Sequence, residues 1–334
     1  MVTRIATTTG MAAVAAIALA AVAGCSSSSS SSSSAPSSAA ASATNASASA
    51  STSASSGSNP LSGGGASGSV VVGSANFPES ELLAEIYAIG LTDKGVKAST
   101  KLNIGDREVY YPQVVKGAIT VFPEYNGALL QGEVDPTSTA KTTAAVDSAL
   151  TAKLPSSVEI LNPAPAQDSD SMTVTQATAT KYHLKSIADL KSHASGWVLG
   201  APSEFKTRPD GIAGLKANYG LTFKSFDPLD ESGPLTLAAL TGGKVQVADV
   251  FTTTPQIITD HLVSLSDPKS NFAAQNVIPL VYKADATSTM TTTLNAISAK
   301  LTTAALLQMD NAVITEKQNY DTVATAFLKS IGIS

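Results

Sequence analysis

The sequence is poor in the residues on which metal sites and many enzymes depend. Its 334 residues include one cysteine and three histidines. No second cysteine is available for a disulfide or a zinc site, and the histidines do not follow a metal-binding spacing such as HxxxH. The motifs GxSxG and GxxxxGKS/T are missing, and no GxGxxG follows a predicted strand. We therefore expect no metal, no cofactor, no catalytic residues and no enzymatic activity.

Clustered positive charge is also missing. The net charge is −5, and the 21 lysines and arginines are scattered along the chain. A protein that binds nucleic acid usually carries a basic patch or stripe. The composition therefore argues against a nucleic-acid partner.

The N-terminus has the layout of a bacterial secretion signal. Arg4 precedes an apolar run from Met11 to Val22, and Cys25 follows the small residues Ala23 and Gly24. The run is well short of the roughly 20 residues that span a bilayer. We interpret residues 1–24 as a signal peptide and Cys25 as the lipidated first residue of a protein held on the extracytoplasmic face of the cell membrane. An ordinary cleaved signal with an incidental cysteine is the alternative.

Residues 25–69 are almost entirely small and polar. Serine, alanine, glycine, threonine and asparagine dominate this segment. Such a segment has little apolar surface to bury, so folding could not offset the entropy that is lost when the chain becomes ordered. We therefore expect a flexible tether. A glycosylated segment or a wall spacer would have the same composition. We expect the folded part of the chain to begin near residue 70.

Strand-like and helix-like patterns alternate through the rest of the chain, which predicts an α/β fold with mostly parallel strands. The expected strands are residues 70–73, 119–122, 172–175, 197–200, 245–250 and 277–282. The expected helices begin at Pro78 and lie near residues 107–116, 210–218, 235–240 and 255–261, with an all-helical tail over 291–332.

Six segments, in order, resemble motifs of the ProX/OpuAC-type glycine betaine/choline-binding proteins of ABC importers. They are GSANFPES (73–80), DREVYYP (106–112), FPEYNG (122–127), EFKTRPDG (204–211), ADVFTT (248–253) and LNAISAKLT (294–302). The resemblance covers the chain from about Val70 to its end. It implies a type II periplasmic-binding-protein fold: residues 70–168 plus 274–334 form one α/β lobe, residues 169–273 form the other, and two hinge segments join them.

The resemblance also implies where and what the protein binds. Members of this family hold a quaternary ammonium solute in the inter-lobe cleft, mainly within a box of four tyrosines. These positions fall on Tyr125, Phe251, Met172 and Gln275, so two of the four are not aromatic here. The family often carries lysine where Ala75 stands, which leaves Arg208 as the candidate for an anionic group of the ligand, with a surface ion pair as its alternative. Asn126 and Thr252 are further candidates for hydrogen bonds to the ligand.

The expected function is therefore that of the monomeric solute-binding component of an ABC importer. Its permease in the membrane is the expected partner, and glycine betaine, choline or carnitine is the default solute. Because two cation–π contacts are lost from the box, the sequence predicts that glycine betaine binds weakly or not at all, and that Gln275 hydrogen-bonds a polar group of another solute. A non-quaternary polar or planar solute is the main alternative, and an extracytoplasmic enzyme or adhesive module is a more distant one.

Overall fold

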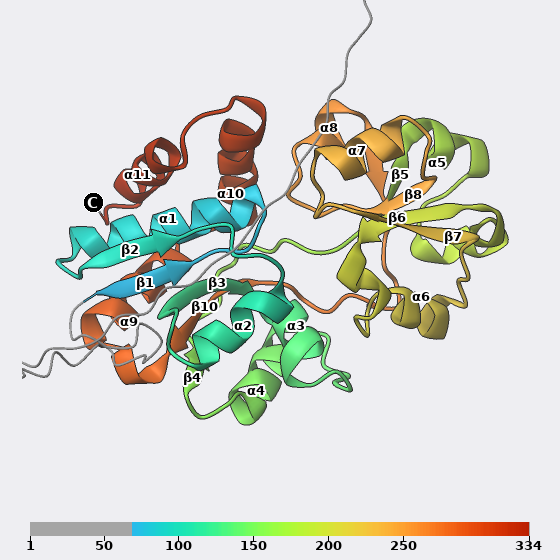
Figure 1. Cartoon of the computed structure of the whole chain (residues 1–334). Coiled ribbons are helices and arrows are strands. Elements are labelled where there is room, and N and C mark those ends of the chain that lie inside the picture. Colours follow the sequence, from blue (N-terminus) through green and yellow to red (C-terminus); the bar gives the residue numbers. More distant parts are fainter. Residues whose placement is uncertain (1–68, 334) are drawn as a thin grey trace, which may run out of the picture. The chain divides into compact units, whose positions relative to one another are not determined.

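Two separate sheets organise the chain, and a computed structural model describes residues 69–333 (Figure 1). Cys25, the predicted signal peptide and nearly all of the predicted tether lie outside these residues. Each sheet has five strands, in the orders β2-β1-β3-β10-β4 and β7-β6-β8-β5-β9. None of the helices within 69–333 has the length and apolar character needed to span a bilayer.

Helices cover both faces of the first sheet. Alternate residues of β10 face opposite sides: Val277 and Val281 belong to one apolar core, and Ile278 and Leu280 belong to another. This alternation follows from the two-residue period of a strand. The strands are β1 (Val70–Gly73), β2 (Ala98–Lys101), β3 (Val121–Tyr125), β4 (Val158–Ile160) and β10 (Val277–Tyr282). The helices around this sheet are α1 (Pro78–Asp93), α2 (Arg107–Val115), α3 (Asn126–Leu129), α4 (Thr143–Lys153), α9 (Ser288–Ser298), α10 (Thr303–Asp310) and α11 (Tyr320–Ser330).

The second sheet has the same three-layer organisation. Leu199 and Val247 face one apolar core, and Ala248 and Val250 face a smaller one with Leu240 of α7. Its strands are β5 (Met172–Thr175), β6 (Val198–Pro202), β7 (Ser225–Leu229), β8 (Val247–Asp249) and β9 (Leu262–Ser264). Its helices are α5 (Gln176–Tyr182), α6 (Ile212–Tyr219), α7 (Pro234–Thr241) and α8 (Gln256–Thr259).

The expected α/β class is confirmed, and each sheet is mixed: four of its five strands run in one direction, as expected, and the fifth runs against them. β1 pairs in parallel with β2 and β3, and β6 pairs in parallel with β7 and β8. β10 and β5, in contrast, are antiparallel to both of their neighbours. Each of these two strands follows a crossing of the chain from one sheet to the other, so it enters its sheet in the reverse direction.

The chain crosses between the sheets twice, through residues 161–171 and 265–276. Asn126 attaches the second crossing to the first sheet, because its Oδ1 accepts hydrogen bonds from the backbone N–H groups of Gly127 (2.9 Å) and Asn276 (2.8 Å). A Cβ at Gly127 would lie 2.3 Å from the carbonyl oxygen of Ala274. Glycine is therefore required at 127 for this close approach of two backbones.

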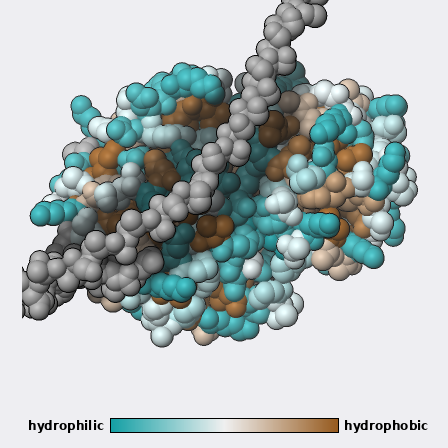
Figure 2. All heavy atoms as spheres, in the orientation of Figure 1, coloured by the Kyte–Doolittle hydropathy of each residue, from teal (hydrophilic) through white to brown (hydrophobic). Residues whose placement is uncertain are grey.

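Hydrophobic residues on the face drawn in Figure 2 are interspersed with hydrophilic ones. The large apolar side chains with high exposure among residues 69–333 are Val109, Leu235 and Ile258, which lie on three different helices. Isolated exposed apolar residues of this kind are normal on a protein surface.

Candidate functional site

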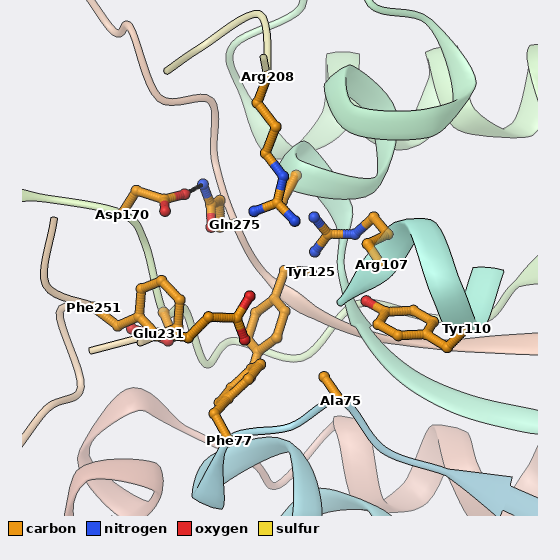
Figure 3. A pocket seen from close by; sticks show the side chains of 12 residues that line it. Ala75, Phe77, Arg107, Tyr110, Tyr125, Asp170, Arg208, Glu231, Phe251 and Gln275 are labelled. Atoms are coloured by element: carbon orange, nitrogen blue, oxygen red, sulfur yellow. Dashed lines mark hydrogen bonds between the residues drawn. The ribbon is translucent and has the colours of Figure 1, made fainter. Parts of the chain in front are cut away.

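A small cavity is bounded by residues of both sheets and both crossing segments (Figure 3). Phe77 comes from the loop between β1 and α1, Tyr125 from the end of β3, and Phe251 from the loop after β8. Loops at the carboxyl ends of strands are the usual ligand sites of open α/β sheets. Its complete lining is Ala75, Phe77, Arg107, Tyr110, Tyr125, Ala128, Asp168, Asp170, Arg208, Glu231, Phe251 and Gln275.

Three aromatic rings form one wall of this cavity. The ring of Phe77 lies between the other two, with its centroid 5.4 Å from that of Phe251 and 6.2 Å from that of Tyr125. The Phe77 and Phe251 rings are nearly perpendicular, at 67°. Rings set at different angles around one space present several electron-rich faces, which is the arrangement that attracts an organic cation.

Two guanidinium groups face the same cavity opposite these rings (Figure 3). Arg107 is held by Glu124, whose carboxylate accepts from Arg107 Nε at 3.0 Å and from Nη2 at 3.2 Å. Burial by itself lowers the pKa of Arg107, but the combined attraction of Glu124, Tyr110 and Glu231 outweighs it and the pKa is raised. Arg208 contacts Glu108, with 3.4 Å between Nη2 and Oε2, so an ion pair joins residues from the two sides of the cavity. The two arginines together provide a positive end to the site.

Carboxyl groups surround the remaining side of the cavity. Burial raises the pKa of Asp168 well above its usual range, and Coulomb repulsion from Glu79 adds to the effect. Burial likewise raises the pKa of Glu231 to about 8, although attraction to Arg208 opposes the shift. Asp170 accepts a hydrogen bond from Gln275 Nε2 at 2.7 Å. The site therefore places aromatic rings and carboxyl groups, whose ionised forms a bound cation would favour, opposite the two arginines, a combination that suits a zwitterion.

Four of the predicted ligand residues lie around this cavity: Tyr125, Phe251, Gln275 and Arg208. The side-chain amide of Gln275 is already used as a donor to Asp170. The ion pair given as the alternative for Arg208 is present, with Glu108 and Glu204 as its partners, and Arg208 lines the cavity as well.

The other three predicted residues do not line the cavity. Met172 is fully buried in the core of the second sheet, since its position in β5 turns its side chain into that core. Asn126 is also fully buried, and its Nδ2 donates to Asp147 Oδ1 at 2.7 Å. Thr252 Oγ1 donates to Asp168 and accepts from the Ser169 backbone N–H. The polar side chains of Asn126 and Thr252 are thus hydrogen-bonded within the protein.

Other residues of the cavity could not be predicted from the sequence. Phe77 belongs to the GSANFPES motif, but nothing local indicates that its ring meets Phe251, which is 174 positions away. Arg107 belongs to the DREVYYP motif, and it both pairs with Glu124 and reaches the cavity. Asp168, Asp170 and Glu231 carried no recognisable motif. What they share is a carboxyl side chain that lies either just after the end of a strand or in a crossing segment.

Within residues 69–333 one group of carboxylates is compact enough to hold a metal ion. Ligand atoms of Asp106, Glu204 and Glu231 lie within 4.8 Å of one another. A guanidinium nitrogen of Arg208 lies 3.8 Å from Glu204 Oε1. The Arg208 guanidinium therefore supplies positive charge to this group of carboxylates.

Comparison with known proteins gives consistent matches. The family model described as the substrate binding domain of ABC-type glycine betaine transport systems (OpuAC) matches residues 68–330. The glycine betaine-binding protein YehZ of Escherichia coli (strain K12) is 26% identical over 280 residues, which are 80% of this chain and 92% of that protein.

Solved structures share the fold. A glycine betaine/carnitine/choline ABC transporter structure has a TM-score of 0.62 and 22% identity, covering 79% of this chain and 99% of the other. Lactococcal OpuAC in its closed-liganded conformation with glycine betaine has a TM-score of 0.57 and 16% identity, covering 79% and 96%. These matches confirm the predicted type II periplasmic-binding-protein fold.

Proposed function

The chain belongs to the family of substrate-binding domains of ABC-type glycine betaine transport systems, and from this premise we propose that it binds a quaternary ammonium zwitterion of the betaine class between its two sheets. As a member of the family it is the extracytoplasmic solute-binding component of an ABC importer, whose permease is its partner. The observation that carries the proposal for the ligand is the cavity in which Phe77, Tyr125 and Phe251 face Arg107 and Arg208.

Each end of a betaine finds a matching group in this arrangement. The methylated ammonium has no hydrogen-bond donor, so aromatic faces and nearby carboxylates attract it. The carboxylate suits a planar guanidinium, which donates two parallel hydrogen bonds. Phe77 partly replaces the rings lost at Met172 and Gln275. We therefore revise the prediction of weak betaine binding, which considered only two rings, towards measurable binding.

Binding requires the cavity to open. Its volume is about 30 Å³, whereas one water molecule already needs roughly 10–15 Å³. We propose that residues 70–168 plus 274–334 and residues 169–273 are lobes that separate about the two crossing segments. Opening would break the Arg208–Glu108 ion pair and the hydrogen bond from Thr253 to Glu79, and the ligand would enter before the lobes close again.

Two solutes that differ at one end test this proposal. Arg208→Gln is expected to weaken glycine betaine binding by about tenfold, because a charge-assisted contact to the carboxylate is lost. Choline carries a hydroxyl in place of the carboxylate, so its affinity should change by less than about threefold. Isothermal titration calorimetry of both solutes measures the difference. The exposed Lys206→Gln provides a matched loss of charge that should affect neither solute.

Equal losses for both solutes would show that Arg208 acts on lobe closure and not on the carboxylate. If the unaltered protein bound neither solute while a planar, non-quaternary metabolite bound, the proposed ligand class would be wrong and the alternative solute class would replace it. The proposal assigns no catalytic role to any residue.

We also propose that Cys25 anchors a monomeric chain to the membrane through a lipid. Cys25→Ser is expected to move the protein from the membrane fraction to the soluble extracytoplasmic fraction, because the apolar run that precedes Cys25 is too short to span a bilayer. Fractionation followed by immunoblotting measures the distribution. Retention of the variant in the membrane fraction would contradict the lipid anchor.

A further inference from the structure

The acids that line the solute cavity differ in how they are held. Asp168 accepts a hydrogen bond from the Thr253 backbone N–H at 3.0 Å, and Asp170 accepts one from a side-chain amide at 2.7 Å. In Glu231, by contrast, Oε2 is buried and has no hydrogen-bond partner in the part of the chain that the structure describes. Buried polar atoms are normally paired, so an unpaired oxygen in a ligand cavity indicates a position that the ligand completes.

Glu231 lies in a short loop between β7 and α7, and several contacts hold this loop in place. Asp230 accepts hydrogen bonds from two backbone N–H groups in the first turn of α7, at 3.0 and 2.8 Å. Ser232 has a φ of +53°, which is unfavourable for a residue other than glycine unless its surroundings hold it. Its Oγ accepts from the Phe251 backbone N–H at 2.7 Å. The loop thus fixes Glu231 beside the aromatic wall, with its side chain pointing into the cavity (Figure 3).

Charged and titratable groups from several elements surround Glu231. Arg208 attracts its carboxylate but forms ion pairs with Glu108 and Glu204. Because acids outnumber cations here, the position favours either a proton or a bound cation. The surrounding groups are Asp106, Arg107, Tyr110, Tyr125, Asp168, Asp170, Glu204 and Arg208 and, in the neighbouring hollow that Glu231 also lines, Glu79, Asp260, Asp310, Lys317 and Tyr320.

In the empty cavity Glu231 carries a proton at neutral pH. Burial raises the pKa of Glu231 to about 8, although attraction to Arg208 opposes the shift. An ammonium group in the cavity would stabilise the carboxylate, lower this pKa and expel the proton to the solvent. Because the ionised form binds the cation, affinity should rise with pH up to about 8, above which the carboxyl group of the empty site is already ionised.

We propose that Glu231 makes the solute site selective for positive charge: its carboxylate contacts the ammonium group of the ligand, and its proton is exchanged for that cation. This inference rests on the proposed betaine-class function and names a contact within the same cavity. The aromatic wall accommodates the methyl groups of a cation and of its neutral isostere alike. A neutral isostere, however, leaves Glu231 protonated and gains no contact between opposite charges. Glu231 therefore reads the ammonium, whereas Arg208 reads the carboxylate.

Choline and its neutral isostere 3,3-dimethyl-1-butanol test this selectivity, because choline has no carboxylate for Arg208 to bind. Calorimetry with the full-length chain should show that choline binds about fivefold more weakly at about pH 6.5 than at about pH 8.5. Titrations in phosphate and in Tris at about pH 7.5 should show release of about half a proton per choline. At about pH 8.5 the isostere should bind at least about tenfold more weakly than choline.

Glu231→Gln keeps the size and polarity of the side chain but cannot ionise. At about pH 8.5 it should weaken both choline and glycine betaine by about tenfold, and it should abolish the proton release. Glu231→Asp retains an acid and should retain the proton release. Glu316→Gln makes the same change at an exposed position and should alter either affinity by less than about threefold. Thermal unfolding of each variant checks that it is folded.

Undiminished choline binding by Glu231→Gln would overturn this inference. Proton release that persists in Glu231→Gln would also overturn it, because another acid of the cavity would then be the source. Equal affinity of the unaltered chain for choline and for the isostere would have the same consequence. These results leave the proposed function standing as long as the unaltered chain binds glycine betaine. Binding of neither choline nor betaine would overturn the proposed function, and this inference with it.

Discussion

The Arg107→Met variant should lose about 3 kcal/mol of unfolding free energy, the largest loss of stability we expect from a single change at the site. Arg107 and Glu124 form a buried pair, with side-chain exposures of 9% and 0%. Without Arg107, the Glu124 carboxylate keeps its hydrogen bonds from the Tyr110 hydroxyl and the Tyr125 N–H but loses the opposite charge. An uncompensated buried charge is the physical cause of the loss. Urea unfolding followed by circular dichroism measures it.

Two further variants make this test specific. Arg107→Met combined with Glu124→Gln removes both charges and should recover part of the lost stability. Lys153→Met breaks the pair with Asp135, in which Lys153 is 53% exposed, and should cost less than about 1 kcal/mol. An Arg107→Met loss as small as that of Lys153→Met would contradict the importance of burial for this pair.

Tyr125→Ala is expected to raise the Kd for glycine betaine by about thirtyfold or more, since a desolvated cation–π contact contributes about 2 kcal/mol. Tyr125 is buried at the end of β3, and its ring forms one side of the aromatic wall with Phe77. Removal of the ring leaves the ammonium without that face. Calorimetric titration of the variant and of the unaltered protein with glycine betaine gives the ratio of their Kd values.

Tyr125→Phe is the matched control, because it keeps the ring and removes the hydroxyl that donates to Glu79. Its Kd should stay within about threefold of that of the unaltered protein. If the Ala and Phe variants bound betaine equally well, the ring would have no part in recognition. Equal and large losses in both would assign the effect to the Glu79 hydrogen bond.

The inner strands of both sheets could be predicted from the sequence, and the outer strands could not. Segments predicted as strands became β1, β3 and β10 of the first sheet and β5, β6 and β8 of the second. The four strands that were missed, β2, β4, β7 and β9, are the two edges of each sheet. Inner strands are buried on both faces and read as apolar runs. The edge strands lack such a run, because β2 has the polar sequence ASTK, β7 contains Asp227 and Pro228, and β4 and β9 have only three residues each.

Local capping was also incompletely predictable. Three threonines at 252–254 precede Pro255, a pattern in which a hydroxyl usually caps the following helix, but α8 has no side-chain cap. Thr253 Oγ1 donates to Glu79 and Thr252 Oγ1 donates to Asp168 instead. These partners are far away in the sequence, so the tertiary structure decided how the hydroxyl groups are used.

The sequence by itself determined the family, the α/β class and four residues of the cavity: Tyr125, Phe251, Gln275 and Arg208. It did so because motifs and apolar runs are local properties of a chain. Only the tertiary structure placed Phe77 against Phe251, turned Met172 into a core, and joined Arg208 to Glu108 across the cavity. Those outcomes depend on strand register and on contacts between distant segments, and a change of one residue in register sends a side chain to the opposite face of its sheet.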